Sequence, residues 1–181
     1  MQQKGPAMGR GRLSTLVIGA RARRMRSGVW SIPRSLQSRN DCGVLTVQTL
    51  ANRQYLSAGA IVALDEIQDP QNLGAICRTA ECVGATGVVI PERRSAEITP
   101  AVCKASAGAV EHLRVARVRN LADFLGDAQK AGAWCYGAAA VPEAVDYLAP
   151  DWTGGVVLVL GAEGKGLRPR VAASCDQLVR L

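Results

Sequence analysis

The chain has 181 residues, which allow one compact domain with a buried core and leave little room for a second. Nearly half of the residues (48%) are apolar and only 20% are charged, which excludes a disordered or fibrous chain. No apolar run approaches the roughly 20 residues of a membrane span, so we expect a soluble, cytoplasmic protein.

The net charge of +7 comes from the N-terminal arm. Residues 1–40 contain nine of the 22 Lys and Arg residues and no acidic residue, whereas the rest of the chain has 13 basic and 15 acidic residues. Such an arm suits RNA, because each neutralised phosphate releases counterions. A solvated tail and an Arg-rich transit peptide are the alternatives, although nothing marks a cleavage point.

Periodicity is weak before Ala60. Candidate strands lie at Leu13–Ala20 and Val44–Leu50, but neither is followed by a convincing helix. We interpret residues 1–59 as a poorly defined N-terminal extension, a candidate remnant of an RNA-binding domain, and residues 60–181 as the folded domain.

From Ala60 onward, short β-branched runs alternate with helical patterns, which predicts a mostly parallel α/β sheet covered by helices. The expected strands are Ile61–Leu64, Gly87–Ile90, Leu113–Val118, Trp134–Ala138, Gly155–Leu160 and Gln177–Leu181. The Val/Leu run of Gly155–Leu160 should be buried on both faces.

Helices are expected between these strands. The first carries an apolar stripe and ends at Gly84, the second begins near Thr99-Pro100, the third is capped by Asn120 and a short fourth opens at Pro169. The stripe of the first helix consists of Leu73, Ile76, Cys77, Ala80 and Val83.

The six cysteines include no C-x-x-C pair, so neither a metal site nor a disulfide framework is expected. Cys77, Cys103 and Cys135 stand among small apolar residues, where a free thiol behaves as a core residue.

Two motifs follow predicted strands, at the edge where open α/β sheets bind ligands. The first is DEIQDPQNLG, Asp65–Gly74, with Arg78 further along the helix. Asn72 is predicted to cap this helix and to offer its amide to a ligand, and Arg78 to reach back toward the same crevice. Alternatively, Asn72 is an ordinary cap and Arg78 an ordinary exposed arginine.

The second motif is GAEGKGL, Gly161–Leu167, after the most apolar strand. Its three glycines let the backbone wrap a ligand and expose its N–H and C=O groups. It is neither G-x-G-x-x-G nor a Walker sequence, which argues against a dinucleotide-binding oxidoreductase or an NTPase.

Together the motifs resemble the SpoU family of RNA methyltransferases. The segment LDEIQDPQNLGAICRTAECVGATGVVIP (Leu64–Pro91) is similar to the first motif of the family, and VVLVLGAEGKGL (Val156–Leu167) to the second. Between them, RSAEITP (Arg94–Pro100), KASAGA (Lys104–Ala109) and EHL (Glu111–Leu113) resemble the branch that acts on a guanosine ribose of large-subunit ribosomal RNA.

The resemblance implies a SPOUT-type fold with a C-terminal trefoil knot, a homodimer, and S-adenosyl-L-methionine as cofactor. It implies a catalytic site containing Asn72, Arg78, Glu163 and Glu111, and a cofactor loop formed by Leu160, Gly161, Ala162, Glu163, Gly164 and Gly166. We predict RNA contacts for Arg78, Arg94, Lys104 and Lys165. Arginine stays charged, so Arg78 is expected to clamp a phosphate and stabilise a developing alkoxide rather than act as a base.

The third motif of the family, a Ser-Leu-Asn-Val-Ser-like stretch, would follow Leu181 and is absent from this chain, so we expect an incomplete knot. The main expectation is methylation of a ribose 2'-hydroxyl of a guanosine in large-subunit ribosomal RNA, with transfer RNA as the alternative substrate. The alternative is a non-catalytic RNA-binding module, which cofactor affinity would distinguish.

Overall fold

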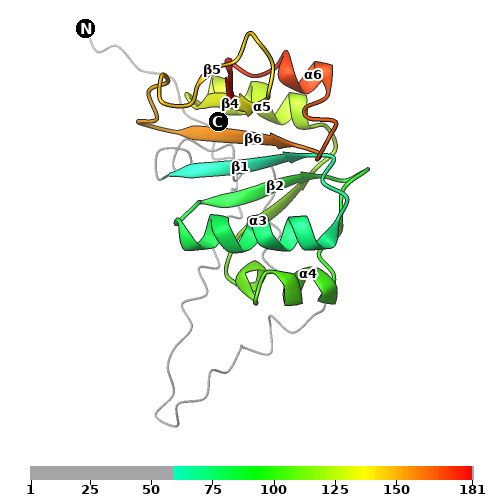
Figure 1. Ribbon diagram of the computed structural model, residues 1–181. Coiled ribbons are helices and arrows are strands. Elements are labelled where there is room, and N and C mark those ends of the chain that lie inside the picture. The colour runs from blue at the N-terminus through cyan, green and yellow to red at the C-terminus, as the bar shows by residue number, and fades with distance from the viewer. Residues whose placement is uncertain (1–58, 181) are drawn as a thin grey trace, which may run out of the picture. The chain divides into compact units, whose positions relative to one another are not determined.

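The computed structural model describes residues 59–180, which form a parallel sheet with helices on both faces (Figure 1). The strands are β1 (Ala60–Asp65), β2 (Gly87–Pro91), β3 (Val115–Val118), β4 (Trp134–Ala138), β5 (Val145–Asp146), β6 (Val156–Gly161) and β7 (Gln177–Arg180). The helices are α3 (Pro70–Cys82), α4 (Pro100–Ala105), the short 3-10 helix η2 (Ala109–Glu111), α5 (Leu121–Lys130) and α6 (Pro169–Ala172).

The strand order is β3-β2-β1-β6-β4-β7-β5, and neighbouring strands are parallel throughout this sheet. The central pair is β1 and β6, in register from Ala60 opposite Val156 to Asp65 opposite Gly161. Both strands therefore end together, and the two sequence motifs leave the sheet side by side. The mostly parallel α/β fold predicted from the sequence is confirmed.

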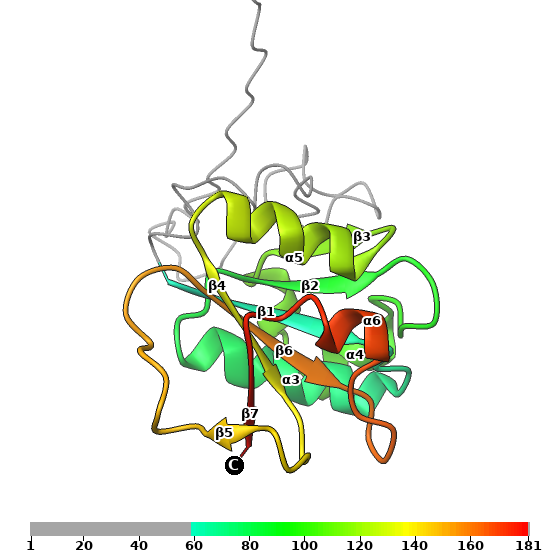
Figure 2. The same ribbon diagram turned by 90° about the horizontal axis from the view of Figure 1, so that it is seen from above.

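The helices form two layers. Helices α3 and α4 lie on one face and α5 and α6 on the other (Figures 1 and 2). The α5 layer packs on alternate strand residues such as Ile61, Ala63 and Val157, and the α3 layer on Leu64, Val88 and Ile90. Two-sided burial explains why the central strands are almost continuously apolar.

The sequence predicted most elements, with local differences. Asn120 caps α5 by accepting a hydrogen bond from the Ala122 N–H (3.1 Å), as expected. Val83 was expected in the apolar stripe of α3 but is 75% exposed, because it follows the last turn as the C-cap. Leu158 and Leu160 are only half-buried, so the face of β6 that points away from α5 is incompletely covered.

Gly74 lets α3 approach α4 closely. A Cβ atom on Gly74 would lie 2.4 Å from the Ala105 Cβ and 2.9 Å from the Ser106 backbone nitrogen. These contacts lie well inside van der Waals distance, so the two helices would have to separate. Gly74, the last residue of the first sequence motif, thus has a packing role.

We expect Gly74→Ala to lower the free energy of unfolding by about 1–3 kcal/mol, the usual cost of overpacking. Urea denaturation followed by circular dichroism measures it. The matched control is Gly126→Ala within α5, where a Cβ meets no atom within 4 Å. Alanine there should stabilise by about 0.5–1 kcal/mol. Equal midpoints for the two variants would contradict this explanation.

The cysteines of the core are confirmed in part: Cys77 and Cys135 are buried, whereas Cys103 is half-buried. Burial raises the pKa of Cys77 to about 11, and burial, with Asp176 and Cys175 nearby, raises the pKa of Cys135 to about 12. Both groups therefore stay protonated, and the thiolate is the reactive form.

At about pH 8, iodoacetamide is therefore expected to label the exposed Cys82 at least about 100-fold faster than Cys77 or Cys135. Peptide mass spectrometry at successive times measures the three rates. Denaturant should bring the three rates together, and equal rates in the native protein would contradict the buried placement.

Within residues 59–180, no helix is long and apolar enough to cross a membrane. The basic arm and the candidate strands Leu13–Ala20 and Val44–Leu50 lie outside the described residues. The knot stays a prediction.

Candidate functional site

A hollow lies where β1 and β6 end. Asp65 and Gly161 face each other as the last residues of the two strands, and the chain leaves the sheet at both points. The hollow has a volume of about 210 Å³. Its lining comes from both motifs: Glu66, Ile67, Gln68, Asp69, Asn72, Ala162, Glu163 and Lys165.

Asn72 points across this hollow. The predicted capping role was wrong: Asp69 is the N-cap of α3, its carboxylate accepts a hydrogen bond from the Gln71 N–H (3.0 Å), and Pro70 opens the helix. Asn72 already belongs to the first turn, so its side-chain amide is not used for capping. It donates instead to the Glu163 Oε2 (3.4 Å), 91 residues away in the chain.

The glycine-rich segment 161–167 is a tight loop closed on itself. An antiparallel bridge joins Ala162 to Gly166, whose N–H donates to the Ala162 carbonyl oxygen (2.8 Å). Gly164 and Gly166 have φ values of 73° and 67°, which favour glycine. At Gly161 a Cβ would lie 2.2 Å from the Gly166 carbonyl carbon, so the loop closes only over a glycine.

An ion pair missing from the sequence analysis ties this loop to β1. The Asp65 side chain is 0% exposed and binds the Arg168 guanidinium through Nη2 (2.7 Å) and Nε (2.8 Å). The hydrogen bond with Asp65 raises the pKa of Arg168 further above its usual value. The only sequence signal was an Asp ending a buried strand, which local periodicity does not pair with a residue 103 positions away.

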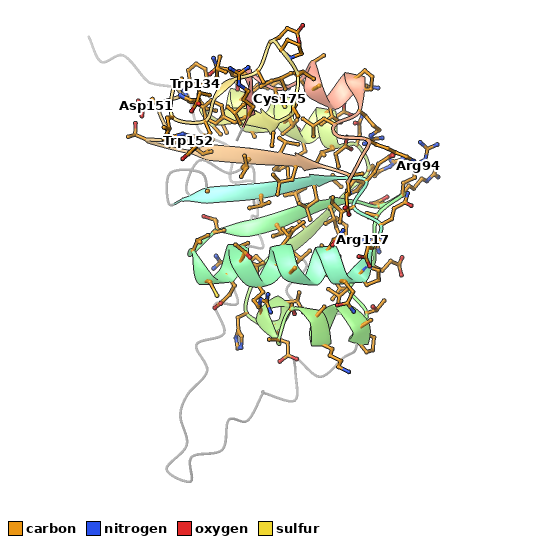
Figure 3. The ribbon with its side chains drawn as sticks, in the orientation of Figure 1. Arg94, Arg117, Trp134, Asp151, Trp152 and Cys175 are labelled. Atoms are coloured by element: carbon orange, nitrogen blue, oxygen red, sulfur yellow. The ribbon has the colours of Figure 1, made fainter. Side chains whose placement is uncertain are left out.

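The remaining predicted residues are dispersed. Lys165 lines the hollow. The exposed Arg94 pairs with Glu66 (3.3 Å) where β1 and β2 end, and Trp134 and Trp152 lie at the other end of the strands (Figure 3). Arg78 is exposed on α3, Lys104 is exposed in the last turn of α4, and Glu111 is exposed in η2. None of these last three residues lines the hollow.

Of the predicted cofactor residues, Ala162 and Glu163 line the hollow, and the other four adjoin them in the chain. Leu160 is a half-buried apolar side chain, and the segment 161–166 presents its backbone at the surface. Apolar surface beside backbone donors and acceptors suits an adenosine-containing ligand. The volume is below the roughly 300–1,000 Å³ of complete ligand sites, so these residues fit such a ligand as one wall of its site.

Residues 59–181 match the model of the SpoU rRNA Methylase family. A curated relative, the 23S rRNA (guanosine-2'-O-)-methyltransferase RlmB of Xanthomonas campestris, is 48% identical over 121 residues, which are 67% of this chain and 48% of the relative. The protein of the same name from Pseudomonas syringae is 44% identical over the same lengths. The chain thus spans about half the length of the curated relatives it matches.

Solved structures of methyltransferases share the fold of this chain. An AdoMet-bound rRNA methyltransferase from Sinorhizobium meliloti superposes with a TM-score of 0.68 at 29% identity, covering 76% of this chain and 51% of that one. The SpoU methyltransferase AviRb from Streptomyces viridochromogenes, solved in complex with AdoMet, gives 0.60 at 26% identity, with coverage of 67% and 47%. The chain therefore belongs to the SpoU rRNA methylase family, a family of RNA methyltransferases.

Proposed function

We propose that this chain carries the catalytic core of an S-adenosylmethionine-dependent RNA ribose 2'-O-methyltransferase. The observation that carries the proposal is the meeting of Asn72 and Glu163 across one hollow, from motifs that leave two adjacent strands. AdoMet in the related solved structures and the 2'-O-methyltransferase names of the curated relatives support the cofactor and the reaction class.

In this reaction a bond forms between the ribose 2'-oxygen and a methyl carbon, the bond from that carbon to sulfur breaks, and the hydroxyl proton leaves. S-adenosylmethionine, when bound against residues 160–166, supplies the methyl group on a positively charged sulfur. Asn72 and Glu163 align the ribose hydroxyl in this proposal. The amide and the carboxylate both line the hollow, so each can form a hydrogen bond with that hydroxyl. Arg78 does not line the hollow, but it stays charged on the exposed surface of α3, where it suits a phosphate of the bound RNA.

The substrate that we propose is a guanosine of large-subunit ribosomal RNA. The names of the relatives RlmB support it, and transfer RNA is the alternative. Exposed basic side chains of Arg78, Arg94, Lys104 and Lys165 provide phosphate contacts, and the basic arm of residues 1–40 adds charge. We also propose that the protein forms a homodimer and acts in the cytoplasm.

The test is transfer of labelled methyl groups from S-adenosylmethionine to unmodified 23S-type ribosomal RNA transcripts and, separately, to unmodified transfer RNA. Nuclease digestion and mass spectrometry then identify the modified nucleoside. We expect 2'-O-methylguanosine in the ribosomal RNA. Methylation of transfer RNA alone would change the substrate, and RNA binding without transfer to either RNA would favour a non-catalytic module.

A further inference from the structure

The glycine-rich loop starts and finishes beside one residue of the central strand, Asp65. It leaves the sheet at Gly161, which lies opposite Asp65 in the register of β1 and β6. It returns at Arg168, whose backbone N–H donates to the Asp65 Oδ2 (2.8 Å) while its guanidinium binds the Oδ1. Both ends of the loop are therefore fixed to one residue of the central strand.

The carboxylate has no alternative partner in solvent. Asp65 is 0% exposed, and a buried charge is tolerated only when it is paired and hydrogen-bonded. The planar fork of Arg168 meets one carboxylate oxygen through two nitrogens while the backbone meets the other. This arrangement, which we call the Asp65–Arg168 latch, permits few other positions of Arg168.

A second carboxylate turns toward the same guanidinium. Glu66 adopts a left-handed φ of 58°, which is unfavourable for a residue with a side chain. Its Oε1 lies 3.5 Å from the Arg168 Nη1 and 3.3 Å from the Arg94 Nη1. Because Glu66 also lines the hollow, the latch adjoins the candidate site directly.

The position of the loop determines where two residues of the hollow lie. Ala162 and Glu163 line the hollow, and Glu163 stands 3.4 Å from the amide of Asn72. Arg168 itself does not line the hollow. Displacements of about 1 Å in a binding site are enough to lower catalysis roughly 100-fold.

We propose that the Asp65–Arg168 latch positions the glycine-rich loop and thereby sets the affinity of the site for S-adenosylmethionine. Arg168 is a positioning residue in this proposal, since it acts through the loop. The inference rests on the proposed function for the identity of the ligand, but the position of the loop can be measured without any ligand.

The variants for the test are Arg168→Lys, which keeps the charge and loses the fork, and Arg168→Gln, which loses both. The first control is Arg170→Gln, which removes an arginine two residues away whose ion pair with Asp123 is exposed at both ends. The second is Ala128→Gly, which weakens the buried face of α5 and lowers stability while leaving every residue of the loop unchanged. The readouts are hydrogen exchange of the Gly166 amide, whose bond to Ala162 closes the loop, and calorimetric titration of S-adenosylmethionine.

We expect Arg168→Gln to accelerate exchange of the Gly166 amide and to weaken cofactor binding, each by about tenfold or more, with Arg168→Lys in between. Both controls should leave both readouts within about twofold of wild type. If the Arg168 variants change only the melting temperature, as Ala128→Gly does, the proposal is overturned. If the wild-type chain binds no cofactor, the proposed function fails, and the exchange rate alone still supports or overturns the positioning of the loop.

Discussion

The Gly161→Ala variant is expected to bind S-adenosylmethionine with an affinity at least about 100-fold lower than that of the wild type. The loop that carries the proposed cofactor residues can no longer close in this variant. The added Cβ would lie 2.2 Å and 2.3 Å from the carbonyl carbon and oxygen of Gly166, and 2.5 Å from the Leu167 nitrogen. These are backbone atoms, so no side-chain rotation relieves the collision. The free energy of unfolding should fall by about 1–3 kcal/mol, the cost of overpacking.

Equilibrium dialysis with labelled cofactor measures the affinity, and urea denaturation measures the stability. The Gly126→Ala variant serves as control, because its new methyl group meets open space on α5. It should bind cofactor as the wild type does. Wild-type affinity in Gly161→Ala would show that closure of this loop is not needed for binding.

Asn72→Ala and Glu163→Gln are each expected to lower the rate of methyl transfer by about 100-fold, the usual effect of removing a group that positions or stabilises the reacting atoms. The double variant should lose little more than either single variant, because the two side chains act as one pair across the hollow. Single-turnover transfer to the RNA substrate is the measurement.

Stability separates this prediction from a trivial loss of folding. Asn72 is exposed within α3, where alanine is the better helix former, so Asn72→Ala should unfold no more easily than wild type. Gln71→Ala changes the adjacent exposed residue, which does not line the hollow. Equal activities of the Asn72 and Gln71 variants would remove Asn72 from the proposed site.

The strands and most helix ends could be predicted from the sequence because their signals are local. The Val/Leu run of β6, the cap at Asn120 and the proline at the start of α6 each specify their own element. The two-residue strand β5 offered no such signal and was missed. The half-exposure of Leu158 was also missed, since hydrophobicity alone does not reveal which face of a strand is covered.

The sequence could predict the two motifs of the site but not the contacts between their side chains. Asn72 was the predicted cap of α3, and only the fold shows that Asp69 caps the helix and that Asn72 faces Glu163. The pairing of Asp65 with Arg168 joins residues 103 positions apart, which no local pattern indicates. The strand order that brings β1 beside β6 creates both contacts.

The central claim is tested most directly by calorimetric titration of S-adenosylmethionine into the purified 181-residue chain. ATP, which shares the adenosine but lacks the sulfonium, is titrated in parallel. We predict saturable binding of one S-adenosylmethionine per chain, with ATP bound at least about tenfold more weakly, because the loop lacks a phosphate-binding fingerprint. No binding of S-adenosylmethionine by a chain whose circular dichroism and cooperative unfolding show that it is folded would contradict the account.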